Sequence, residues 1–196
     1  MTRIARLAAI AALLCAALPS HATTISYQTT LGPEAAGATG TGFVTVDYDT
    51  LAHTLDISSN WSGLSGLTTV AHIHCCVSVP ATGTIGVAVT PGTLPGFPVG
   101  VSAGSYSTLI DLTLASSFTA SFINNFAGGV ADNAEEALIA GFNNGSAYFN
   151  IHTTLFPGGE IRGFPAAVPE ASSYAMMLAG LVLVGAMARR RKLAKV

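Results

Sequence analysis

Lysine is absent from the middle of this 196-residue chain, and charged side chains of either sign are scarce throughout, at 9% of all residues. Seven of the eight basic residues lie within the first six or the last eight positions, so Arg162 is the only one between residues 23 and 167. A hydrophobic fraction of 50% excludes a disordered polyelectrolyte. The shortage of cations in the middle excludes a basic nucleic-acid binder, and no nucleic-acid partner is expected.

Signatures of common catalytic sites are not prominent either. The chain has no phosphate-binding loop and no Cys-x-x-Cys pair, and we expect no serine-nucleophile site. Trp61 is the only tryptophan and is expected in the core rather than on a surface that stacks sugars. We therefore expect no enzymatic activity and no obligatory cofactor.

The first 22 residues have the anatomy of a secretory signal peptide. Arg3 and Arg6 precede an apolar run from Leu7 to Leu18, and small residues stand before a cut after Ala22. The run is too short to span a bilayer comfortably. The expected partners of this segment are the secretion machinery and signal peptidase. The alternative is an N-terminal helix packed on the domain.

The last 29 residues, 168–196, have the features of a second targeting segment. We expect a transmembrane helix over about residues 172–188, followed by a basic end over 189–195. The basic cluster would remain cytoplasmic and stop the helix in the membrane. Its members are Arg189, Arg190, Arg191 and Lys192.

Three parts in order, Val168-Pro169-Glu170, the apolar stretch and the arginines, resemble the PEP-CTERM protein-sorting signal of Gram-negative bacteria. Ala171 replaces the second proline of that family's Val-Pro-Glu-Pro box. The resemblance implies that exosortase, a membrane-embedded cysteine peptidase, removes the helix, usually in bacteria that make exopolysaccharide. The protein would be anchored transiently and then displayed at the cell surface. The alternative is a plain membrane anchor.

Between the two targeting segments, residues 23–167 have the pattern of an antiparallel β-domain. Short runs alternate apolar and polar residues and are separated by Gly, Pro and Asn clusters, which favours a sandwich or a barrel. The runs cover residues 42–48, 53–58, 71–74, 85–89, 108–112, 147–152 and 160–162. A hairpin turn is expected between the first two runs, and a loop over residues 91–100.

One helical excursion interrupts the strands. Asp132 and Glu135 have the spacing of a capping box, and apolar residues follow at helical intervals up to Phe142. Gly145 follows two asparagines and is expected to end the helix with a positive φ. Residues 117–126 are expected to add a turn or two of helix.

Two segments, Ala71 to Val89 and Gly145 to Gly163, resemble the CHRD domain, which occurs in chordin and in bacterial secreted proteins. The resemblance implies a mainly β, barrel-like extracellular domain without an established enzymatic activity. The residues that carry it are His72, His74, Tyr148, Asn150, His152, Gly159, Glu160, Arg162 and Gly163.

A His-x-His pair on a strand places two imidazoles on one face. His72 and His74 form such a pair, and His152 on a late strand is the third candidate ligand for one Cu or Zn ion. The nearest precedent is the His-x-His strand of copper/zinc superoxide dismutase. The alternative is that these imidazoles form hydrogen bonds that hold the sheet together.

Cys75 and Cys76 are the only cysteines outside the signal peptide. They are expected to form a vicinal disulfide, to remain reduced on opposite faces, or to ligate a metal beside His74. Glu160 and Arg162 share a strand face, and Arg162 is expected to clamp a carboxylate or several carbonyls rather than to bind an anion.

The segments together predict an exported protein with an acidic domain, because residues 23–167 contain nine carboxylates and only one arginine. The expected function is structural or adhesive, through contact with exopolysaccharide or other surface proteins. The alternative is a metal-binding domain.

Overall fold

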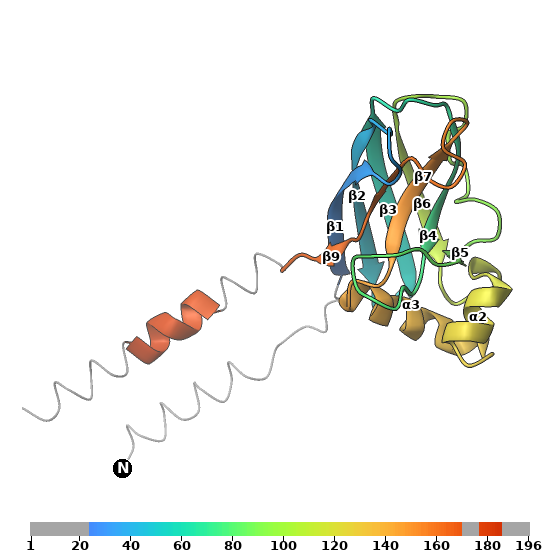
Figure 1. Ribbon diagram of the computed structural model, residues 1–196. Coiled ribbons are helices and arrows are strands. Elements are labelled where there is room, and N and C mark those ends of the chain that lie inside the picture. The colour runs from blue at the N-terminus through green and yellow to red at the C-terminus, as the bar shows by residue number, and fades with distance from the viewer. Residues whose placement is uncertain (1–23, 170–176, 186–196) are drawn as a thin grey trace, which may run out of the picture.

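The computed structural model describes residues 24–169 and 177–185 (Figure 1). The predicted signal peptide, Glu170 and the basic cluster lie outside the described residues. The strands are β1 (Thr24–Pro33), β2 (Thr41–Asp49), β3 (Thr54–Ser62), β4 (Thr68–His74), β5 (Val87–Val89), β6 (Gly104–Asp111), β7 (Tyr148–Thr153), β8 (Ile161–Gly163) and β9 (Ala166–Ala167).

All the strand pairs are antiparallel, and the strands form one sheet in the order β5-β4-β7-β8-β1-β2-β3-β6, with β9 beside β1. Strand β1 joins two halves of this sheet, one formed by β5, β4, β7 and β8 and the other by β2, β3 and β6. The first part of β1 pairs with β2, and its last residues pair with β8. The prediction of a mainly β, antiparallel fold is confirmed. The two halves are joined through β1, so the sheet curls as a half-barrel instead of splitting into two separate sheets.

Alternation along the strands builds the core. In β3, Leu55, Ile57 and Trp61 are buried while their neighbours face outward, as a period of two requires. The core position expected for Trp61 is confirmed. The predicted loop over residues 91–100 also exists, but Leu94 and Phe97 from this loop are buried in the core.

Two helices, α2 (Ala120–Phe126) and α3 (Ala134–Asn143), cover one end of the curled sheet (Figure 1). They lie between β6 and β7, where the excursion was predicted, and Gly145 follows them with φ of +73°. The predicted capping box is wrong. Asn133 occupies the N-cap position after a short 3-10 turn, and Glu135 bonds to side chains of the β2–β3 hairpin instead.

Residues 177–185 are helical, within the span predicted to cross the membrane. In residues 24–169 and 177–185, no helix has the length and apolar character needed to cross a membrane. The rest of the predicted span lies outside the described residues. Val168 adjoins the end of the domain, where its backbone N–H donates to the carbonyl of Ser26 at 2.8 Å.

Candidate metal centre

Strands β4 and β7 lie side by side and bring the three predicted histidines together. In their register, His72 is opposite Asn150 and Val70 is opposite His152. His72 and His74 therefore share one face of β4, and Asn150 and His152 share the same face of β7. One ring nitrogen from each of the three histidines lies within 4.8 Å of the others.

In each imidazole, the ring nitrogen that points away from the other two histidines lies against a backbone carbonyl. His72 Nε2 lies 2.7 Å from Gly92 O, and His74 Nδ1 lies 2.7 Å from Ile85 O. His152 Nδ1 lies 2.8 Å from Pro157 O. A carbonyl oxygen only accepts hydrogen bonds, so the ring nitrogen that faces it carries the proton. This fixes the tautomer of all three rings.

The opposite nitrogen of each neutral ring is consequently a lone-pair acceptor. These acceptors are His72 Nδ1, His74 Nε2 and His152 Nε2, and they face one another. His72 Nδ1 lies 3.1 Å from His152 Nε2. The arrangement matches that of a metal-ligating histidine, whose remote N–H is held by a carbonyl while the other nitrogen faces the ion.

Burial favours the neutral form of the His72 and His74 rings. His72 is 8% exposed and His74 is 7% exposed. Loss of hydration lowers the pKa of His74 to about 4, against smaller opposing contributions from its hydrogen bonds to Ile85 and Asn150. Burial also lowers the pKa of His72. A neutral imidazole is the form that ligates metals.

Asn150 stands between the rings and a second group of side chains. Its Oδ1 lies 3.1 Å from His74 Nε2 and 3.2 Å from His152 Nε2. Its Nδ2 donates to Glu34 Oε2 at 3.1 Å. Glu34 follows β1, so three distant parts of the chain meet here. Sequence reasoning missed Glu34, because a single carboxylate after a strand carries no signal.

Arg162 on β8 clamps this group from outside. Its Nη1 donates to Glu34 Oε1 at 3.3 Å and to Gly83 O at 2.7 Å. Its guanidinium lies 5.4 Å from the centre of the Tyr148 ring, which is stacked on His74 at 4.6 Å. The expectation that Arg162 holds a carboxylate and a carbonyl is confirmed.

Glu160 lies in a different environment from Arg162. Its buried carboxylate accepts from the Thr153 hydroxyl at 2.6 Å and from the backbone N–H groups of Ser65 and Gly66. It therefore fastens the turn after β3 to β7. The structure does not bring Glu160 to the histidines.

Two glycines named by the family resemblance make room for close approaches. Gly159 has φ of +123°, and a Cβ there would overlap the Glu34 carboxylate and lie 3.0 Å from Asn150 Nδ2. At Gly163 a Cβ would lie 2.5 Å from the backbone oxygen of Thr30. Both positions therefore need a residue without a side chain.

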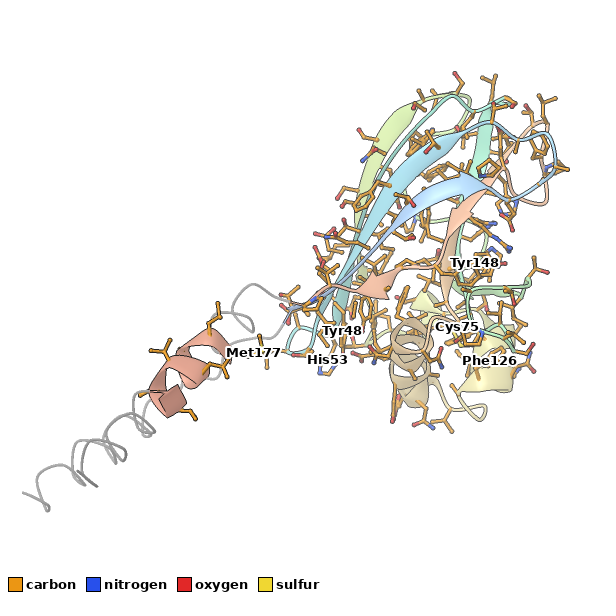
Figure 2. All side chains as sticks on the ribbon, turned by 60° about the vertical axis from the view of Figure 1, so that its left-hand side comes forward. Tyr48, His53, Cys75, Phe126, Tyr148 and Met177 are labelled. Atoms are coloured by element: carbon orange, nitrogen blue, oxygen red, sulfur yellow. A yellow bond between two sulfur atoms is a disulfide. The ribbon has the colours of Figure 1, made fainter. Side chains whose placement is uncertain are left out.

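Cys75 and Cys76 form a vicinal disulfide directly after His74, at the helical end of the sheet (Figure 2). Of the three alternatives left open by the sequence, this is the first. It removes both thiols as ligands beside His74. Helix α3 packs on the disulfide through Gly141, where a Cβ would lie 3.0 Å from Cys76 Sγ and still nearer to Cys75 Sγ.

A second polar cluster lies where the β2–β3 hairpin meets α3 (Figure 2). The Tyr48 hydroxyl donates to Glu135, and His53 Nδ1 lies 2.9 Å from the same carboxylate. Burial, followed by the contact with Glu135, raises the pKa of Tyr48. His53 is half exposed. The hairpin itself was predicted, and the Asp49 carboxylate closes it by accepting from the N–H groups of Leu51 and Ala52.

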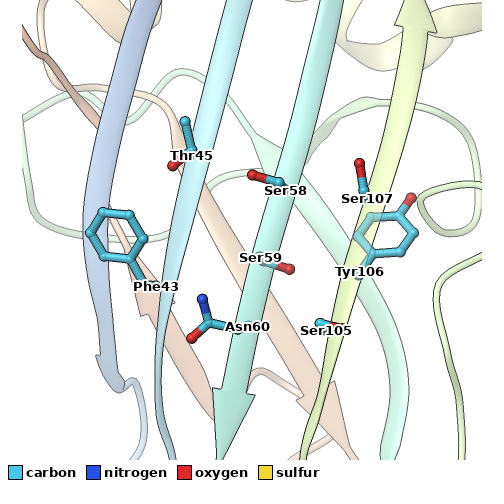
Figure 3. A pocket seen from close by; sticks show the side chains of 8 residues that line it. All are labelled: Phe43, Thr45, Ser58, Ser59, Asn60, Ser105, Tyr106 and Ser107. Atoms are coloured by element: carbon cyan, nitrogen blue, oxygen red, sulfur yellow. The ribbon is translucent and has the colours of Figure 1, made fainter.

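The outer face of β2, β3 and β6 carries a polar shelf (Figure 3). The register aligns two rows across the three strands, which together form a shallow hollow of about 380 Å³. One side chain in these rows, Phe43, is an aromatic ring that is 36% exposed. The rows are Phe43, Asn60 and Ser105, and Thr45, Ser58 and Ser107.

A Gly-x-Ser-x-Gly sequence does occur, from Gly100 to Gly104, although no serine-nucleophile site was expected. The structure places Ser102 in the segment that leads into β6. A nucleophile elbow needs a sharp turn from a strand into a helix, which this segment is not.

The family comparison agrees with this architecture. Residues 21–164 match the CHRD domain and residues 167–192 match the PEP-CTERM protein-sorting motif. The chain therefore belongs to the CHRD domain family and ends in a PEP-CTERM signal. No curated protein and no solved structure matches the chain. The PEP-CTERM motif implies export, sorting to the cell surface and processing by exosortase.

Proposed function

We propose that this exported domain binds one Cu or Zn ion through His72, His74 and His152. The observation that carries the proposal is that one nitrogen of each ring lies within 2.8 Å of a backbone carbonyl oxygen, which assigns the tautomer of the three rings. Because each outer N–H is held by a carbonyl, three lone pairs converge. Converging acceptors repel one another, and a cation between them turns that repulsion into attraction.

The spacing suits a small transition-metal ion. Ligands about 2.0–2.1 Å from a tetrahedral ion lie about 3.3 Å apart. His72 Nδ1 and His152 Nε2 are separated by 3.1 Å, close to that edge. The widest separation, up to 4.8 Å, requires His74 to move inward on binding. Imidazole nitrogens favour Zn and Cu over Mg or Ca.

The proposed role is binding rather than catalysis. His72 and His74 expose less than a tenth of their surface, so the centre offers little access to a substrate. A buried ion that joins β4 to β7 would stabilise the fold outside the cell, where this small domain has a single disulfide within its described residues.

Metal titration of the full chain in detergent tests the proposal. After removal of metal with a chelator, calorimetry with Zn²⁺ or Cu²⁺ is expected to give one site per chain. His72→Ala and His152→Ala should abolish it. His53→Ala is the matched control, since His53 lies in the hairpin cluster, and it should bind as the wild type does. Unchanged binding in His72→Ala would refute the proposal.

A structural or adhesive role is the second candidate, and the polar shelf favours it. Its two rows offer hydroxyl and amide groups around the ring of Phe43, with no charged side chain among them. Such a surface suits a neutral polysaccharide, whose sugars combine hydroxyl groups with an apolar face.

Retention on immobilised exopolysaccharide from the producing bacterium tests this second candidate. Phe43→Ala should weaken retention of the full chain. Leu51→Ala, which removes an exposed apolar side chain in the β2–β3 turn, should leave retention unchanged. Equal retention of the two variants would speak against the polar shelf.

A further inference from the structure

We infer that Asn150 Oδ1 is the fourth ligand of this ion, and that Glu34 and Arg162 are the positioning residues that aim it. The inference rests on the proposed metal site. It makes the coordination sphere three nitrogens and one oxygen, all supplied by the protein.

The orientation of the Asn150 amide follows from Glu34. A carboxylate that accepts from Arg162 offers only lone pairs to its neighbours. The amide atom 3.1 Å from Glu34 Oε2 must then be the NH₂ group, which leaves Oδ1 facing the histidines. The flipped amide would place its oxygen against the Glu34 carboxylate, and the repulsion opposes that arrangement.

Asn150 Oδ1 thereby becomes a fourth acceptor in the cluster. It lies 3.1 Å from His74 Nε2 and 3.2 Å from His152 Nε2, and both nitrogens are lone-pair acceptors. Asn150 is 1% exposed, so its amide is shielded from bulk solvent. An ion within the cluster would turn all of them into ligand–ligand edges, near the tetrahedral value of about 3.3 Å.

The supporting contacts are arranged to hold this amide still. Arg162 is itself fixed by Gly83 O and by the Tyr148 ring, and it holds Glu34. Gly159 lacks the Cβ that would displace Glu34. These contacts come from residues that do not touch the ion. Outer partners of this kind are worth roughly 10–100-fold in metal affinity.

A closed sphere defines the kind of ion and its role. Structural zinc sites have four protein ligands, whereas catalytic sites keep one position for water. An amide oxygen beside three imidazoles suits Zn²⁺ or Cu²⁺ better than Cu⁺, which prefers soft sulfur ligands. The centre would thus hold a divalent ion that links β4 and β7, with β1 and β8 as its outer support.

The test uses Co²⁺ as a spectroscopic probe in the metal-free full chain. The wild type is expected to show the intense visible absorption of a four-coordinate ion. Isotopically labelled water should leave its electron paramagnetic resonance lines unbroadened, because no water is bound. A broadened wild-type spectrum would overturn the inference, and this readout needs no variant to fold.

Variants add a second arm. Asn150→Ala should still bind one Co²⁺, roughly 10-fold or more weakly, and should gain a broadened signal as water enters. Glu34→Gln should weaken binding by roughly 10–100-fold. Asn60→Ala, on the polar shelf, is the control and should match the wild type. If His72→Ala binds normally, the metal site itself fails. If His72→Ala loses binding but Asn150→Ala equals the wild type, only the fourth ligand fails.

Discussion

His72 Nδ1 lies 3.1 Å from His152 Nε2, although both nitrogens are lone-pair acceptors. The two rings are held in this relationship from outside, by the carbonyls of Gly92 and Pro157. The fold thus stabilises a contact that is unfavourable by itself. A cation between the rings would convert it into a favourable one, so the proposed metal site predicts that the stability of the domain depends on metal.

The first prediction concerns metal removal. At a free Zn²⁺ concentration 100 times the dissociation constant, the full chain should gain about 2.7 kcal/mol in free energy of unfolding. Urea unfolding with and without a chelator measures the difference. His152→Ala should remove the difference, and His53→Ala should keep it. A chelator that leaves the wild-type curve unchanged contradicts the prediction.

The second prediction concerns acid and Glu160. Burial alone would raise the pKa of this carboxyl, but hydrogen bonds from Thr153, Ser65 and Gly66 outweigh it and lower the pKa below the usual 4.5. The stabilisation is therefore present above pH 4.5 and lost as the pH falls through the folded-state pKa.

Glu160→Gln should remove this component of the acid sensitivity. Glu160→Ala should lower the free energy of unfolding at neutral pH by on the order of 3 kcal/mol, because it leaves buried donors unpaired. Urea unfolding between about pH 3 and pH 7, roughly the range over which carboxyl groups titrate, checks both expectations. Glu136→Gln, at an exposed carboxyl on α3, is the control. Equal acid profiles for the two variants would argue against the role of Glu160.

The third prediction concerns the packing of α3 on the disulfide. Gly141→Ala introduces a Cβ that cannot fit beside Cys75 and Cys76. Overpacking of this kind should lower the free energy of unfolding by about 1–3 kcal/mol, although alanine has a higher helix propensity than glycine. Gly86→Ala is the matched control, since nothing lies within 4 Å of its added Cβ. Thermal unfolding of both variants gives the comparison, and a more stable Gly141→Ala protein would contradict it.

The fourth prediction concerns processing at the PEP-CTERM motif. In cells that contain exosortase, the extracellular form should lack the C-terminal helix and the basic cluster. Mass spectrometry of that form measures its last residue. Deletion of exosortase should keep the helix attached. Peptides that extend beyond Ala175 in the extracellular form of wild-type cells would rule out processing.

The sequence predicts much of the fold because alternation survives in most strands. Strand β3 alternates buried and outward residues throughout, and the predicted run over residues 53–58 covers its first part. Strand β1, which joins the two halves, was not among the predicted runs. Only Tyr27 and Leu31 along it are fully buried, so its alternation is weak. The curling of the sheet into a half-barrel depends on this strand, and it could not be derived from the local sequence pattern.

The candidate site is divided in the same way. His72 and His74 follow from strand periodicity, and His152 from its place on a late strand. The groups that orient them come from loops, including the carbonyls of Gly92, Ile85 and Pro157. Backbone carbonyls have no signature in a sequence, because every residue carries one. The capping-box prediction at Asp132 was wrong because Glu135 has a better partner in the distant hairpin.

X-ray absorption at the metal edge of the Zn²⁺-loaded full chain tests the central claim most directly. The account predicts one ion per chain with three imidazole nitrogens and one oxygen, all about 2.0–2.1 Å from the metal. A chain that retains no metal, or an ion with fewer than three imidazole ligands, would contradict it.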